Sequence, residues 1–354
     1  MNTHHNILAN LFSNKQIDIL HGKLLNETPT KIAVDFDRIT GMIWGVAIGD
    51  ALGFPTEGLL PDRRKKRHGD ITSYTKNIGS VSDDTQLTMW TLEQMIADQE
   101  FIPENIAAKF CEGNIIGMGQ TVRGFRKNFK QGLPWYECGP KSAGNGALMR
   151  IAPIIIPHIN DSALLWKNTT LLAMMTHNDS GSISACLAFV YMLRELLQMS
   201  KPPRSRWWLD TYVEIAKQFE RDASYRPRGG SFRGYHGTIY SFAKKRIAEA
   251  KEKDLSVLDA CNSWYSGAYL LETVPSVIYI LTKYGNDPQQ AITRAATDTK
   301  DNDTIAAIVG AAMGALHGKK SFPQKWIENH CGRADVHSPL IEETLQKAQE
   351  LWTL

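Results

Sequence analysis

The chain has 354 residues, of which 43% are hydrophobic and 22% charged; this composition is typical of a globular protein with a substantial buried core. Its 40 basic and 37 acidic residues give a net charge of +3, too small a bias to indicate a nucleic-acid partner. Apolar runs stay below the roughly 20 residues that cross a bilayer, and residues 1–16 lack the features of a secretory signal. We therefore expect a cytoplasmic protein with no membrane partner.

Residues 1–36 differ from the rest of the chain, because they hold only two short apolar clusters between polar stretches. We interpret them as an N-terminal extension, followed by a single domain of residues 37–354. From Ile39 onward, apolar side chains recur at positions i, i+3, i+4 and i+7, which is the spacing of one helix face. This first helix is expected to end between Gly49 and Gly53.

Helical periodicity continues through most of the domain. Further helices are predicted at residues 85–99, 104–111, 182–197, 208–220, 239–253, 269–283, 288–297, 304–316 and 339–353. Strand-like alternation is confined to residues 71–75 and 154–156, so the pattern predicts an all-α fold. The basic stretch 61–69 and the glycine-rich stretch 225–237 are predicted to be loops.

Two acidic strings stand at the starts of predicted helices. They are Ser82-Asp83-Asp84-Thr85 and Asp301-Asn302-Asp303-Thr304. Each combines carboxylates with a hydroxyl residue, and oxygen ligands of this kind suit Mg²⁺ or Mn²⁺. Each string can equally be read as an ordinary helix cap, since serine, aspartate and asparagine are favoured there. Taken separately, the strings leave both interpretations open.

Three further strings could belong to a site. Glu57 follows a glycine-rich turn, which could direct it into a cleft or leave it as a surface glutamate after a helix end. Gly144-Asn145-Gly146 permits close approach of a ligand to the backbone, or is a tight turn. His177 could contact a ligand, although a lone histidine is more often structural.

The order of these strings favours one family. GDALGFPTE, SDDT, GNGALMR, TH and DNDT followed by IAAIVGAAMGALHG resemble the ADP-ribosylglycohydrolase family over residues 39–320. The resemblance implies an all-α domain with a central dinuclear site for two Mg²⁺ or Mn²⁺ ions. It implies removal of ADP-ribose from modified protein side chains, and we expect arginine-linked ADP-ribose rather than the serine-linked form. Residues 225–237 would then be a lid over the ADP-ribose or a contact for the modified protein.

The resemblance also assigns roles to residues of this chain. Glu57 and Asp84 match catalytic positions, with Glu57 as a base or gate beside the metals rather than a nucleophile. Gly144, Asn145, Gly146 and His177 match positions near the bound ADP-ribose. The implied metal ligands are Ser82, Asp83, Asp84, Asp301, Asp303 and Thr304.

Two positions depart from the family pattern. Most members have threonine where Ser82 stands, and serine keeps the hydroxyl but lacks the stiffness of a β-branched side chain. Members commonly have Gly-Gly before the second acidic string, whereas Lys300 precedes Asp301 here. A lysine beside a divalent ion is unfavourable unless its side chain points away.

The N-terminal extension suggests a second hypothesis. Some members of the family are immunity proteins against ADP-ribosyltransferase toxins, and residues 1–36 could bind and block such a toxin alongside or instead of hydrolysis. The alternative is that these residues form an extra helix packed on the domain.

Overall fold

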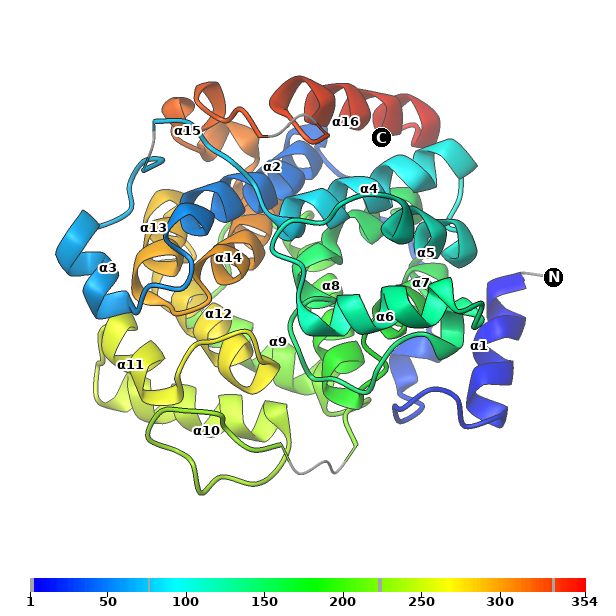
Figure 1. The fold of residues 1–354 in the computed structure, drawn as a ribbon, viewed down its shortest axis with the longest axis horizontal. Coiled ribbons are helices and arrows are strands. Elements are labelled where there is room, and N and C mark those ends of the chain that lie inside the picture. Colours follow the sequence, from blue (N-terminus) through cyan, green and yellow to red (C-terminus); the bar gives the residue numbers. More distant parts are fainter. Residues whose placement is uncertain (1–2, 76, 222–224, 333–334) are drawn as a thin grey trace.

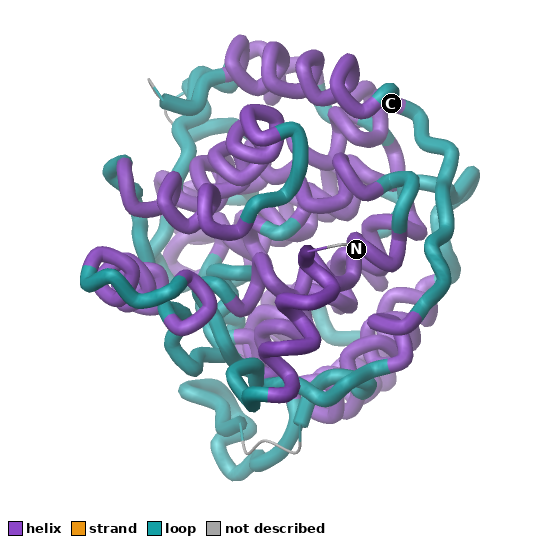
Figure 2. The backbone as a smooth tube through the Cα atoms, turned by 90° about the vertical axis from the view of Figure 1, so that its right-hand side faces the viewer, coloured by secondary structure: helices purple, strands orange, loops and turns teal. Residues whose placement is uncertain are grey.

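The chain folds into packed helices. The computed structural model describes residues 3–75, 77–221, 225–332 and 335–354, and within them only helices, loops and three isolated β-bridges occur (Figure 2). The predicted all-α class is confirmed. The α-helices are α1 (Thr3–Ser13), α2 (Phe36–Gly53), α3 (Pro61–His68), α4 (Asp83–Asp98), α5 (Pro103–Glu112), α6 (Gln120–Lys130), α7 (Ser162–Met174), α8 (Ser180–Leu196), α9 (Ser205–Ala216), α10 (Ile239–Glu252), α11 (Val257–Trp264), α12 (Leu270–Tyr284), α13 (Pro288–Asp298), α14 (Asn302–His317), α15 (Gln324–Glu328) and α16 (Ser338–Trp352). None of the helices in the described ranges is both long and apolar enough to span a bilayer.

Several local predictions were wrong. Residues 61–69 are not a loop: Pro61 starts α3, and Gly69, with a φ of 68°, ends it. A proline at the first helical position and basic residues in the last turn both favour a helix here. Residues 154–156 lie in the 3₁₀ helix Ala152–His158, and residues 71–75 form turns rather than a strand. The helices α6, α7, α11 and α15 were not predicted.

Helices α2 and α14 lie side by side near the middle of the fold (Figure 1). Their contact is made by glycines spaced four residues apart. A Cβ atom added to Gly45 would lie 2.0 Å from the carbonyl oxygen of Gly310, and one added to Gly314 would lie 1.9 Å from that of Gly41. The same seam pairs Gly49 with Ala306, where the corresponding distance is 2.1 Å. At these glycines a side chain larger than hydrogen is therefore excluded, and the two backbones touch directly.

The pairing along this seam shows that α2 and α14 run antiparallel. At its far end, a Cβ atom on Gly53 would lie 2.4 Å from the Cα of Asp303. The C-terminus of α2 thus meets the N-terminus of α14, so the turn that carries Glu57 lies next to the second acidic string.

The N-terminal segment packs on the body of this chain. Leu8 and Leu11 of α1 are buried, and α1 contacts α7. Farther along, the backbone N–H of Asp18 donates to Asn178 Oδ1 at 3.2 Å, and Asn178 Nδ2 donates to the carbonyl oxygen of Gln16 at 2.7 Å. The further buried apolar residues of this segment are Ile17, Ile19, Leu24, Leu25 and Ile32.

Gly310→Ala should lower the free energy of unfolding by about 3 kcal/mol, because the added methyl group meets backbone that cannot move aside cheaply. Urea unfolding measures this change. Gly234→Ala is the matched control, since a Cβ atom there meets nothing within 4 Å, and it should stay within about 0.5 kcal/mol of the wild type. If the two variants were equally stable, the contact between α2 and α14 would not require a glycine at position 310.

Candidate active site

The two acidic strings meet at the N-termini of α4 and α14. Ser82 caps α4: its hydroxyl accepts from the backbone N–H of Asp84 at 3.3 Å and donates to Asp84 Oδ2 at 3.0 Å. The hydroxyl of Thr304, in the first turn of α14, donates to the same Asp84 Oδ2 at 3.2 Å. The first string is therefore a helix cap that also meets the second string, whereas Asp301, at the N-cap position of α14, makes no side-chain cap hydrogen bond within the described residues.

Asp50 is a site residue that the sequence analysis did not assign. It lies on the last turns of α2 and has no exposed surface. Its carboxylate accepts from the backbone N–H of Ser82 at 2.9 Å and from the N–H and hydroxyl of Thr85 at 3.1 and 2.6 Å. Asp50 thus ties the start of α4 to α2. The signal for it was a single carboxylate among the buried positions of α2, which are otherwise almost all apolar or glycine.

The carboxylates form two overlapping groups. Asp50, Asp84 and Asp303 each offer an oxygen within 4.8 Å of the others, and so do Glu57, Asp301 and Asp303. Asp303 belongs to both groups. Burial raises the pKa of Asp84 and of Asp303 well above the ordinary value, and neighbouring carboxylates raise both further. So many like charges in one buried place require protons or cations to balance them.

The donor set fits a divalent metal. Asp84 Oδ1 is buried and finds no hydrogen-bond partner within the described part of the chain, and a buried carboxylate oxygen left in that state is costly. Carboxylate and hydroxyl oxygens are the ligands that Mg²⁺ and Mn²⁺ prefer. Asp50, Asp84, Asp303, Asp301 and Glu57 could hold such ions.

A cavity of about 420 Å³ opens above this cluster. Of the residues predicted for the site, Ser82 alone is not in its lining and lies buried behind it. The predicted residues that line the cavity are Glu57, Asp83, Asp84, Gly144, Asn145, Gly146, His177, Asp301, Asp303 and Thr304. The cavity therefore brings together all five of the strings singled out in the sequence.

Glu57 stands at the edge of this cavity. Its side chain is exposed, as the surface interpretation expected, yet it lines the cavity. Partial burial raises the pKa of its carboxyl group, and the charges of Asp301 and Asp50 raise it further. The turn that carries Glu57 is held by Asn302, whose Nδ2 donates to the carbonyl oxygen of Gly53 at 2.9 Å.

Asn145 contacts a predicted metal ligand directly. Its Nδ2 donates to Asp301 Oδ2 at 2.6 Å and to the hydroxyl of Thr273 at 3.0 Å. The glycine-asparagine string thus orients Asp301 in addition to lining the cavity.

His177 is buried with its ring against the two glycines of this string. A Cβ atom on Gly144 or Gly146 would lie 3.3 or 3.0 Å from the ring. Burial lowers the pKa of His177 to about 3, and the charge of Arg150 adds to the shift, so the ring is neutral. Arg150 Nη2 donates to the hydroxyl of Thr176 at 2.6 Å, and that hydroxyl lies 2.9 Å from His177 Nδ1. When the hydroxyl donates to Nδ1, the proton of the neutral ring is on Nε2.

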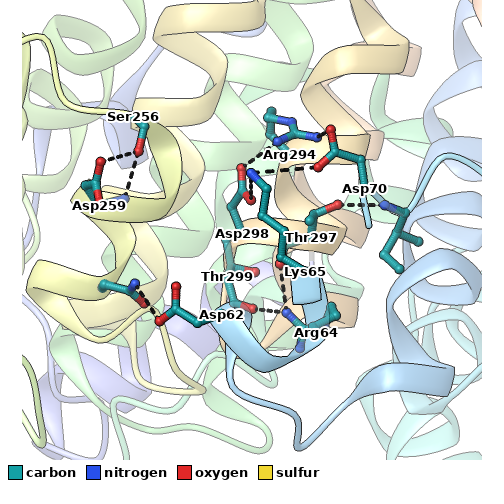
Figure 3. A network of polar contacts seen from close by, with 12 residues as sticks. Asp62, Arg64, Lys65, Asp70, Ser256, Asp259, Arg294, Thr297, Asp298 and Thr299 are labelled. Carbon is teal, nitrogen blue, oxygen red and sulfur yellow. Dashed lines mark hydrogen bonds and ion pairs between the residues drawn. The ribbon is translucent and has the colours of Figure 1, made fainter. Parts of the chain in front are cut away.

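Arg64 is the second residue that the sequence analysis missed. The stretch 61–69 was interpreted as a solvated loop, but Arg64 is completely buried beneath α3 (Figure 3). Its guanidinium donates to the carbonyl oxygens of Thr297 and Thr299 at 3.1 and 2.6 Å, just before the second acidic string. It also donates to the hydroxyl and carbonyl oxygens of Thr56, at 3.0 and 3.2 Å, beside Glu57.

This arrangement places a fixed positive charge behind the carboxylates. Burial lowers the pKa of Arg64 to about 10, while Asp303, Asp298 and Asp301 oppose that shift, so the guanidinium stays charged at neutral pH. Lys65, in contrast, faces outward and lies 3.8 Å from both Asp70 and Asp298 (Figure 3). The buried guanidinium of Arg64 thus joins the turn that carries Glu57 to the segment that leads into Asp301.

The side chain of Lys300 points to Tyr265. Its ammonium nitrogen lies 3.6 Å from the centre of the Tyr265 ring and hydrogen-bonds to the Tyr265 hydroxyl. The local departure from the family pattern is thereby accommodated without an ammonium group inside the carboxylate cluster.

Comparison with known proteins agrees with this arrangement. A sequence model of the ADP-ribosylglycohydrolase family matches residues 31–353. The chain belongs to the ADP-ribosylglycohydrolase family. It is 22% identical to ADP-ribosylarginine hydrolase Tri1 of Pseudomonas putida (strain GB-1), over 89% of this chain and 80% of that protein.

Two further proteins are similar to this chain at comparable identity and coverage. The ADP-ribosyl-[dinitrogen reductase] glycohydrolase of Rhodospirillum rubrum is 23% identical, over 82% of this chain and 89% of that protein. Among solved structures, an ADP-ribosylglycohydrolase-related protein complex superposes with a TM-score of 0.62 at 21% identity, over 90% of this chain and 98% of the other. This structural match shows that the fold is shared.

Arg64→Ala should lower the free energy of unfolding by about 3 kcal/mol or more, because it leaves several buried oxygens without a donor. Thermal or urea unfolding measures the loss. Arg63→Ala removes an exposed arginine from the same helix and should change stability by less than about 0.5 kcal/mol. If the two variants are equally stable, Arg64 does not hold these segments together.

Proposed function

We propose that this protein is a metal-dependent hydrolase that removes ADP-ribose from modified protein side chains, with arginine-linked ADP-ribose as the preferred substrate. The observation that carries the proposal is the shared cavity: a buried carboxylate cluster forms one part of its lining, and the glycine-asparagine string with His177 forms another. Family membership and similarity to an ADP-ribosylarginine hydrolase support it.

The chemistry divides between the two parts of the lining. Two Mg²⁺ or Mn²⁺ ions held by the carboxylates would supply positive charge and Lewis acidity next to the ribose. Backbone N–H groups near Gly144 and Gly146, together with His177 Nε2–H, are suited to donate hydrogen bonds to phosphate or ribose oxygens. The His177 ring is uncharged at ordinary pH, since its pKa is far below 7.

Glu57 is suited to accept a proton. Water attacks the anomeric carbon, its oxygen becomes the new hydroxyl group of ADP-ribose, and Glu57 takes the proton. The C–N bond breaks, and the guanidine nitrogen leaves with the bonding electron pair and takes up the equivalent of the proton that Glu57 accepted, which returns Glu57 to its carboxylate. Asp84, which accepts hydrogen bonds from both Ser82 and Thr304, would hold the two acidic strings in register during this step.

The test is incubation with arginine- and serine-ADP-ribosylated peptides in Mg²⁺, Mn²⁺ or chelator, with released ADP-ribose detected by mass. We expect release that needs metal and is faster for the arginine linkage. Asp84→Asn should reduce turnover at least about a hundredfold. Asp210→Asn, which alters an exposed carboxylate on α9, should stay within about twofold of wild type. Failure to release ADP-ribose from either peptide in either metal would overturn the proposal.

Toxin binding by residues 1–36 stays a prediction and concerns the exposed face of this segment. Leu8 and Leu11 pack on the chain's own body, whereas Asn10 and Asn14 are exposed. The direct measurement is a titration of a purified ADP-ribosyltransferase with wild-type protein and with an Asn10→Glu, Asn14→Glu variant. Inhibition that the variant loses while its peptide hydrolysis persists is the expected result, and inhibition by neither protein refutes it.

A further inference from the structure

A second cavity, of about 330 Å³, adjoins the first. The two cavities share four lining residues, namely Glu57, Arg228, Ala268 and Asp301. The lining found only in the second cavity is Gly58, Tyr265, Gly267 and Lys300. The candidate base and a candidate metal ligand therefore lie in the wall between the two spaces.

The lining of the second cavity is fixed by an unusual turn. Tyr265 and Ser266 have φ angles of 82° and 40°, a conformation that non-glycine residues adopt at a cost of about 1–3 kcal/mol each. The carbonyl oxygen of Ser266 accepts from the N–H of Asp301 at 2.9 Å, and its hydroxyl accepts from the N–H of Lys300 at 3.0 Å. This strained turn is thus bonded to the backbone that carries the second acidic string.

The two cations of this cavity are not equivalent. Arg228 is paired with Glu272, which is completely buried, through contacts of 3.2 Å from Nε and 2.9 Å from Nη2. Its charge is therefore largely compensated. Lys300 contacts the ring and hydroxyl of Tyr265, and no carboxylate of the described residues forms an ion pair with it. Lys300 is the cation whose charge remains available to a ligand.

We propose that the second cavity receives the modified side chain and its neighbouring residue on the target protein, and that Lys300 selects targets with a carboxylate beside the modified residue. This inference rests on the proposed function. If ADP-ribose occupies the cavity with the glycine string and His177, the bond to be cleaved lies at the shared wall, and the acceptor must extend to the other side.

The charges across the second cavity match such an acceptor. Glu57 and Asp301 lie in the shared wall, where they suit a guanidinium group attached to the ribose. Lys300 lines only the second cavity, so it lies beyond that wall, where the residue next to the modified one would be. An exposed or half-buried ion pair of this kind contributes modestly, which corresponds to a preference of about twofold to fivefold.

The experiment uses three ADP-ribosylated peptides that carry the linkage the enzyme cleaves and differ only in one neighbouring residue, which is aspartate, alanine or lysine. We expect the wild-type kcat/KM to be highest for the aspartate peptide and lowest for the lysine peptide. Lys300→Gln should remove the difference and Lys300→Glu should reverse it. Lys244→Gln, at an exposed position on α10, should leave the order unchanged.

Two outcomes overturn the inference: equal kcat/KM values for the three peptides with the wild type, or the original order retained in Lys300→Gln. Binding of free ADP-ribose by each variant checks that it is folded. If the wild type cleaves no peptide, the proposed function fails, and titration of the same uncleaved peptides then tests charge selection by itself. Equal affinities in that titration would also overturn the inference.

Discussion

Direct backbone contact between α2 and α14 is the constraint on which the rest of the structure depends. The glycines at 41, 45, 310 and 314 allow two helices to approach more closely than side chains would permit. This close approach fixes how the two helices are aligned along their axes, and the alignment places Gly53 against Asp303. Catalytic geometry in this fold is thus a consequence of packing between residues that carry no functional group.

Concentrating carboxylates in one place opposes folding unless other groups compensate, and the compensation comes from around the cluster. Asn145 donates to Asp301, and Arg64 supplies a buried cation behind the Glu57 turn, which Asn302 also holds through the carbonyl oxygen of Gly53. Asp50 directs its oxygens at the backbone N–H groups of Ser82 and Thr85, at the start of α4. These contacts hold the carboxylates in position while leaving Asp84 Oδ1 without a partner in the described chain. The side chains are therefore held by hydrogen bonds where the negative charge is most concentrated.

Much of this arrangement could be predicted from the sequence, and the failures have physical reasons. The long helices follow from the 3.6-residue period, and the order of the five strings indicated the family. Asp50 was missed because it looks like an ordinary polar residue near a helix end, and its role depends on a contact with Ser82, 32 residues away. Arg64 was missed because a run of six basic and acidic residues reads as a solvated surface, and nothing local marks the one side chain that turns inward. Helix α7 was missed because it is buried on nearly all sides and so shows no amphipathic period.

The two hydrogen bonds between the N-terminal segment and Asn178 have a consequence for regulation. Asn178 follows His177 in the chain, and its amide group is held at both ends by the backbone of residues 16 and 18. Whatever detaches this segment from the body also releases the residue next to the histidine that lines the cavity. Where that release alters the position of His177, occupancy of the cavity and attachment of the N-terminal segment are coupled, and the coupling free energy is the same in both directions. Through that coupling, a protein that binds the N-terminal segment would change ligand affinity in the cavity without contacting the cavity itself.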